Sequence, residues 1–221
     1  MIKRQKGGMI KQFKLNGRFV VVIGVSHSKA ISKETLHKIL SFMEQFQKTC
    51  ILVEEDAKLS QKTIMNKTNF NEPTTELIVK TLKQIEKKCI NGWDIRPSIL
   101  GTKQNGLYGK NNQGKPHFVT HTLGQIFKEY INKSGNPHKY NKLLQLKTQI
   151  PQNIWETKSL HNLIKDGEFK LKYITELMNS LREDFKNIAD QYILKIIKNC
   201  KNKHLIIICG DKHYDNLIKI L

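Results

Sequence analysis

The chain has 221 residues, a hydrophobic content of 38% and a formal net charge of +19. This length suits a single domain, and no apolar run approaches the roughly 20 residues of a transmembrane helix. The basic N-terminus lacks an apolar core segment, so we expect neither a membrane-spanning nor a secreted protein.

The charge points to an anionic partner, with nucleic acid as one alternative. Most of the cations are lysines, however, and the four arginines are Arg4, Arg18, Arg96 and Arg182. Arginine is the usual choice for bidentate recognition of phosphates and bases, and here it forms no interleaved cluster with aromatic residues. We therefore expect much of the charge to be solvated surface.

The four cysteines, Cys50, Cys89, Cys200 and Cys209, contain no Cys-x-x-Cys pair. In a chain of this length such a pattern is typical of reduced, mostly buried thiols. The sequence therefore predicts a soluble, intracellular (cytoplasmic) protein. Its oligomeric state is left open.

The predicted elements begin after a flexible basic arm, residues 1–17, and form one α/β domain over residues 18–221. The apolar run RFVVVIG at 18–24 is typical of a strand covered on both faces. A helix follows with Ser32 as candidate N-cap, and a second strand occupies 49–56. This order indicates a β-α-β unit.

The second half of the chain is predicted to be mainly helical. A helix over 72–89 precedes a short apolar piece at 89–100, and a glycine- and asparagine-rich loop covers 101–117. Long loops of this kind serve as lids, binding loops or insertions. Further helices are expected around 119–132, 138–148 and 171–199. The last strand, HLIIICG, leads into a short terminal helix.

The spacing Gly-x-x-His occurs twice, each time directly after an apolar strand. Gly24 precedes His27, and Gly210 precedes His213. Glycine lets the chain turn sharply off a strand and lets a substrate or ion approach closely. Because the carboxyl ends of parallel strands meet at one edge, we expect the two imidazoles to converge there.

Acidic and basic residues follow the other strands of the predicted sheet. The second strand ends in Glu54-Glu55-Asp56, and the piece at 89–100 carries Asp94 and Arg96. Two imidazoles and a carboxylate suit a divalent metal such as manganese, cobalt, iron or zinc. They suit a metal-free acid–base pair equally well, with the guanidinium orienting a substrate or an oxyanion.

Other candidate residues have simpler interpretations. His117 and His121 have the spacing of a helical metal pair, but the glutamate of an HExxH motif is absent and we interpret them as loop or surface residues. Trp93 and Trp155 are expected in the core. Tyr214 either lines the site or packs against the strands.

Several segments together resemble the TraB/TIKI group of Gly-x-x-His proteins. These are VVIGVSH, ILVEED, GWDIRPSIL, LREDFKNIADQYI and IIICGDKHYDNLIKIL, which follow the order of the family along the chain. The family is related in fold to erythromycin esterases and ChaN-like proteins. The resemblance implies a mixed, largely parallel sheet flanked by helices, with the active site at the carboxyl ends of the strands.

The resemblance also implies a function and a set of site residues. It implies a hydrolase of peptides or esters that uses His27, Glu54, Arg96 and His213, with the two histidines and the glutamate as ligands where a metal is present. Glu54 is favoured over Glu55 because it directly follows the valine of the strand, as the family residue does. The alternative is a binding protein without turnover, which holds metal or haem or binds nucleic acid.

Overall fold

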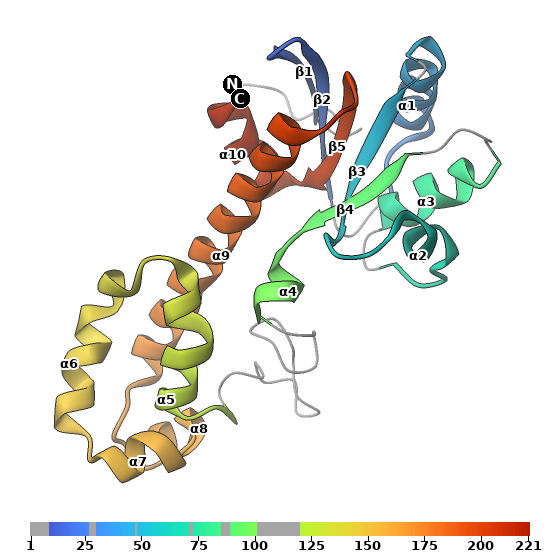
Figure 1. Ribbon diagram of the computed structural model, residues 1–221. Coiled ribbons are helices and arrows are strands. Elements are labelled where there is room, and N and C mark those ends of the chain that lie inside the picture. Colours follow the sequence, from blue (N-terminus) through green and yellow to red (C-terminus); the bar gives the residue numbers. More distant parts are fainter. Residues whose placement is uncertain (1–8, 27–29, 47, 71–72, 85–88, 101–119) are drawn as a thin grey trace. The chain divides into compact units, whose positions relative to one another are not determined.

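The computed structural model describes residues 9–26, 30–46, 48–70, 73–84, 89–100 and 120–221. The chain divides into two compact units (Figure 1), one formed by Met1–Ile95 with Ala189–Leu221 and the other by Arg96–Ile188. The sequence analysis expected one domain over residues 18–221, and within it the second segment has a hydrophobic core of its own.

The first unit contains a five-stranded sheet in the order β1-β2-β5-β3-β4. The strands are β1 (Met9–Leu15), β2 (Arg18–Val25), β3 (Thr49–Asp56), β4 (Ile90–Asp94) and β5 (His204–Gly210). Strand β1 is antiparallel to β2, and all other neighbours are parallel. The prediction of a mixed, largely parallel α/β fold is confirmed, and the last strand of the chain lies in the middle of the sheet.

Residues 9–15 do not belong to a flexible arm, as the sequence analysis expected, but form the edge strand β1. This strand pairs with β2 from Met9↔Gly24 to Leu15↔Arg18. Asn16 and Gly17 connect the two strands with φ angles of 49° and 73°. Asn-Gly is the most favourable dipeptide for such a hairpin turn, because both positions require positive φ.

Helices cover both faces of the sheet. One face packs against α1 (Lys33–Gln45), α2 (Gln61–Asn66) and α3 (Pro73–Leu82). The other packs against the C-terminal part of α9 (Leu171–Asn199) and against α10 (Asp211–Ile220). The predicted N-cap of α1 is confirmed, since the Ser32 side chain accepts a hydrogen bond from the Thr35 amide.

The second unit is helical. It contains α4 (Arg96–Leu100), α5 (Leu123–Ile126), a π-helical turn (Phe127–Ile131), two 3-10 turns (Asn132–Ser134 and Pro137–Tyr140), α6 (Asn141–Gln149), α7 (Gln152–Thr157), α8 (Leu160–Lys165) and the N-terminal part of α9. Its core includes Trp155, as expected. The predicted loop at 101–117 lies outside the described residues. Within the described ranges, no helix is long and apolar enough to cross a membrane.

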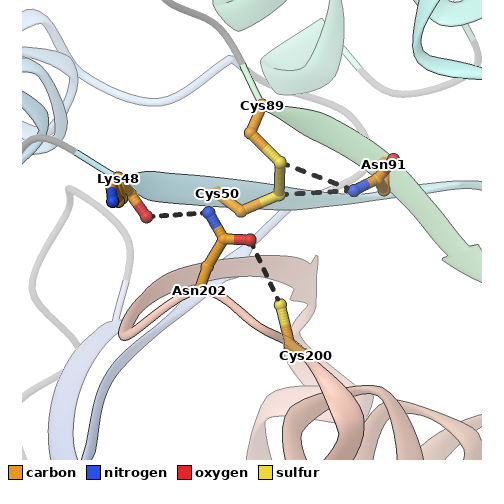
Figure 2. The surroundings of a disulfide bond; sticks show 6 residues. All are labelled: Lys48, Cys50, Cys89, Asn91, Cys200 and Asn202. Carbon is orange, nitrogen blue, oxygen red and sulfur yellow. Dashed lines mark hydrogen bonds between the residues drawn. A yellow bond between two sulfur atoms is a disulfide. The ribbon is translucent and has the colours of Figure 1, made fainter.

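The prediction of reduced thiols is wrong for two of the four cysteines. Cys50 and Cys89 form a disulfide with a Cα–Cα distance of 4.5 Å (Figure 2). They immediately precede Ile51 and Ile90, which are paired in the parallel ladder of β3 and β4. The sequence could not reveal this neighbourhood, because it depends on which strands pair. The argument for a reducing compartment therefore no longer holds.

Candidate functional site

The carboxyl ends of β2, β5 and β3 lie at the same edge of the sheet. Strand β5 pairs in parallel with β2, with Gly24 opposite Cys209 and Val25 opposite Gly210. On its other side β5 pairs in parallel with β3. The two strands that carry the Gly-x-x-His motifs are thus direct neighbours. His27 itself lies outside the described residues, so its meeting with His213 stays a prediction.

His213 is fixed by a buried carboxylate. Helix α10 begins immediately after β5, and His213 lies in its first turn with 5% of its surface exposed. Its Nδ1 lies 2.6 Å from Oδ1 of Asp190, a buried residue of α9. The Asn216 amide donates a hydrogen bond of 2.9 Å to the other carboxylate oxygen. Both oxygens of Asp190 are therefore engaged.

An indole ring confines the same imidazole from another side. Trp93 on β4 is fully buried, and its ring meets that of His213 edge to face with a centroid distance of 5.1 Å. The indole Nε1–H donates to the carbonyl of Ile208 at 2.8 Å, which fixes the plane of the ring. Trp93 is a core residue, as expected, and it also restricts how His213 can rotate.

The contact with Asp190 determines which nitrogen of His213 is free to react. A carboxylate accepts hydrogen bonds, so the neutral imidazole carries its proton on Nδ1 and leaves the lone pair on Nε2. Within the described part of the chain, no protein group is hydrogen-bonded to Nε2. This arrangement prepares Nε2 to accept a proton or to bind an electrophile.

The structure separates the roles of the two adjacent glutamates. Glu54 accepts a hydrogen bond of 3.2 Å from the amide of Gly210, which is the N-cap of α10. Glu55 is 5% exposed and instead forms an ion pair of 2.5 Å with Lys67, the residue that follows α2. Glu54 is therefore the glutamate beside the second Gly-x-x-His motif, and its role in a site stays a prediction.

Negative charge gathers around the end of β5. The thiol of Cys209 is fully buried, and burial is the main cause that raises its pKa well above the usual value. The charges of Glu54, Asp190 and Asp211 raise this pKa further, in that order.

Gly24 has a packing role that the motif alone did not reveal. A Cβ atom at this position would lie 2.8 Å from Cγ of Tyr214, the residue after His213. The absence of a side chain therefore lets α10 pack closely on β2. The close approach that we predicted for a ligand is made here by an aromatic ring.

Two further predicted residues, Asp94 and Arg96, lie at and just beyond the end of β4. Arg96 is the first residue of α4 and belongs to the second unit, whereas Glu54 and His213 belong to the first. Its role in the site stays a prediction. The backbone carbonyl of Asp94, at the end of β4, accepts a hydrogen bond of 2.9 Å from the Ala57 amide.

Of the His117/His121 pair, the structure describes only the second residue. His117 lies outside the described residues, and His121 belongs to the second unit. Its Nε2 lies 3.4 Å from the hydroxyl of Tyr130, which is fully buried. Burial, with a smaller contribution from the charge of Glu129, raises the pKa of Tyr130 to about 12. Tyr130 therefore stays protonated and fixes the imidazole within the helical unit.

Sequence reasoning missed Asp190 and Asn216. A signal for Asp190 existed, because it lies three and seven positions before Ile193 and Ile197, two buried residues of α9. An acidic residue on the apolar face of a helix requires a partner inside the protein. The partner, however, is 23 positions away in the sequence, on an element that only the fold brings to this face.

The metal site that the resemblance implies stays a prediction, because one of its three ligands, His27, lies outside the described residues. Across the described ranges, no group of three or more His, Cys, Asp or Glu residues is placed to hold a metal ion. One nitrogen of His213 is engaged by Asp190, and one oxygen of Glu54 by the Gly210 amide. These two residues alone do not make a metal site, and the third ligand, His27, is not described. We therefore derive no chemical step through a metal.

No family model, curated protein or solved structure matches this chain. The resemblance to the TraB/TIKI group consequently remains a prediction. Arguments about function rest on the geometry at the carboxyl end of the sheet, above all on the buried contact between His213 and Asp190.

Proposed function

We propose that this protein is a hydrolase in which His213, oriented by Asp190, activates water for attack on a carbonyl carbon. The observation that carries the proposal is the 2.6 Å contact between these two buried side chains at the edge where three strands end. A histidine held by a carboxylate is the usual arrangement of a general base. The resemblance to TraB/TIKI proteins supports a peptide or an ester as the substrate.

The proposed step uses the free nitrogen of the imidazole. Nε2 takes a proton from a water molecule while the oxygen of that water forms a bond to the carbonyl carbon. The imidazolium that results is stabilised by Asp190 and then returns the proton to the leaving alkoxide or amine.

Glu54 and Trp93 position the base. Glu54 holds the amide of Gly210, which caps the helix that carries His213. Trp93 limits rotation of the imidazole. In this proposal His27 contributes the second imidazole and Arg96 orients the substrate or the oxyanion, in the roles that the resemblance implies for them.

Whether the hydrolase needs a metal is a separate question, and it is tested by measuring the metal content of the protein. Elemental analysis of the purified protein, repeated on His27→Ala, should give stoichiometric manganese, cobalt, iron or zinc that is lost in the variant if His27 completes a metal site. Equal and negligible metal contents in both proteins would leave the metal-free acid–base mechanism.

Activity on a panel of p-nitrophenyl esters and fluorogenic peptides tests the proposal directly. We expect His213→Ala to lower the rate of hydrolysis by about 10²-fold or more, the usual effect of removing a general base. His161→Ala is the matched control, because His161 is exposed on α8. Equal rates for wild type and His213→Ala, or no turnover of any ester or peptide by the wild type, would reject the proposal.

A further inference from the structure

We propose that Cys50, Cys89 and Cys200 form a thiol–disulfide exchange site at the amino end of β3 and β4. In this site the free thiol of Cys200 attacks the Cys50–Cys89 disulfide. The inference does not depend on the proposed hydrolysis, which concerns the opposite, carboxyl end of the same sheet.

An asparagine that contacts the disulfide lines the same cavity as the free thiol of Cys200. The amide Nδ2 of Asn91 lies 3.3 Å from the sulfur of Cys50 and 3.7 Å from that of Cys89. Asn91 and Cys200 both line a cavity of about 390 Å³ in the first unit, together with Tyr192 and Lys195. Asn91 therefore links the disulfide to the space that Cys200 faces.

A second asparagine holds Cys200 beside β3. The thiol of Cys200 donates to Oδ1 of Asn202 at 3.6 Å. The amide of the same asparagine donates at 2.8 Å to the carbonyl of Lys48, two residues before Cys50. Figure 2 shows the sulfur of Cys200 pointing toward the disulfide from the turn that follows α9. The side chain of Asn202 thus connects the thiol of Cys200 to the backbone just before the strand that carries Cys50, although these residues are far apart in sequence.

The exposure of the three sulfur-bearing residues determines the direction of exchange. Cys50 is fully buried, whereas Cys89 and Cys200 are partly exposed. The Cys200 thiol loses its proton to water, and its thiolate forms a bond to Sγ of Cys50. The Cys50–Cys89 bond breaks with its electron pair on Cys89, which takes up a proton. A departing thiolate is better solvated at partly exposed Cys89 than at Cys50.

Cys209 provides a matched thiol that should not take part. It is free but fully buried, and burial together with nearby carboxylates raises its pKa well above the usual value. Because thiolate is the attacking species, Cys209 should be inert near neutral pH. Replacing Cys209 therefore shows whether any free cysteine, rather than Cys200 in particular, is needed for the exchange.

The first test measures the disulfides of the wild-type chain. The protein is incubated between pH 6 and pH 9, quenched in acid, alkylated with N-ethylmaleimide and digested with pepsin for mass spectrometry. We expect a peptide linked through Cys50 and Cys200 whose initial rate of formation rises about tenfold per pH unit while the thiol is mostly protonated. This peptide should be absent from Cys200→Ser and retained in Cys209→Ala.

The second test traps the new bond. In Cys89→Ser, oxidised glutathione should convert the thiols of Cys50 and Cys200 into a disulfide with release of reduced glutathione. The linked peptide should be lost completely in Cys89→Ser/Cys200→Ser. Formation of Cys50–Cys209, of glutathione adducts alone, or of no Cys50–Cys200 peptide at any pH would overturn the proposal. So would the finding that all four cysteines of the wild type react as thiols.

Discussion

Two buried aspartates of α9 invite comparison, because they lie six residues apart and belong to different units. Asp184 in the helical unit accepts hydrogen bonds from Lys139 at 2.7 Å and from the hydroxyl of Tyr140 at 2.6 Å. Asp190 in the sheet unit holds His213 and Asn216. Each carboxylate is almost fully buried, and each has two partners.

The difference lies in whether the partner can change its charge. Burial and then the hydrogen bond and charge of Asp184 raise the pKa of Tyr140, so its hydroxyl stays protonated. A lysine beside a carboxylate likewise keeps its proton. A histidine, in contrast, is the side chain suited to exchange protons near neutral pH. In the proposed mechanism, the network of Asp184 therefore contributes to stability and that of Asp190 to proton transfer.

The largest expected effect separates the two aspartates by activity. Asp190→Asn should lower hydrolysis by roughly 10²- to 10⁴-fold, because an amide no longer holds the imidazole in the reactive tautomer. Asp184→Asn should retain the wild-type rate. Rates are measured on the ester or peptide that the wild type hydrolyses best, with circular dichroism as a check of folding. Equal losses of hydrolytic rate in Asp190→Asn and Asp184→Asn would contradict the different roles assigned to the two aspartates.

A second prediction concerns stability in the helical unit. Tyr140→Phe removes the hydroxyl that donates to Asp184, and it should lower the free energy of unfolding by about 1.5–3 kcal/mol, as for other hydrogen bonds to charged groups. Denaturation in urea measures this loss. A variant as stable as the wild type would show that Lys139 alone satisfies the carboxylate.

A smaller loss of activity is expected for Asn216→Ala. Asn216 holds the second oxygen of Asp190 and does not contact His213 in the described hydrogen bonds, so it acts as a positioning residue. We expect a decrease of about tenfold in kcat with little change in KM, because orientation of the base affects the chemical step rather than binding. Asn216→Asp would place two carboxylates together and should decrease the rate further.

The smallest expected effect is a change in the free energy of unfolding in alkaline solution. Because the pKa of Tyr140 is raised in the folded state, the native protein retains a proton that the unfolded chain loses above about pH 10. The stabilisation is therefore fully present below pH 10 and declines as the pH rises further. The free energy of unfolding of the wild type should fall more steeply above pH 10 than that of Tyr140→Phe. Parallel pH profiles would contradict this assignment.

The sequence predicted the elements of the sheet unit well where local patterns were strong. Residues 171–199 were expected as one long helix, and the strand HLIIICG corresponds to β5. The hairpin of β1 was missed although Asn16-Gly17 is a strong turn signal, because the basic composition of residues 1–17 was given more weight. Hydrophobic periodicity determines element type, whereas an exposed edge strand has little periodicity to detect.

Of the residues in the candidate site, the sequence indicated only those that directly follow an apolar strand. The second Gly-x-x-His motif and Glu54 could be selected, since each follows an apolar strand. The partner of Asp190 and the Cys50–Cys89 disulfide could not, because each contact joins residues whose proximity depends on strand order and helix placement. Pairing at long sequence separation leaves no local pattern in a single sequence.

By itself, the sequence determined that apolar strands alternate with helices and that histidines follow two of those strands. Such features arise from local propensity and from hydrophobic patterning, which act over a few residues. Only the tertiary structure decided that β5 lies between β2 and β3, that Asp190 meets His213, and that Cys50 is bonded to Cys89. These contacts follow from packing helices on both faces of one sheet, where burial selects the partners.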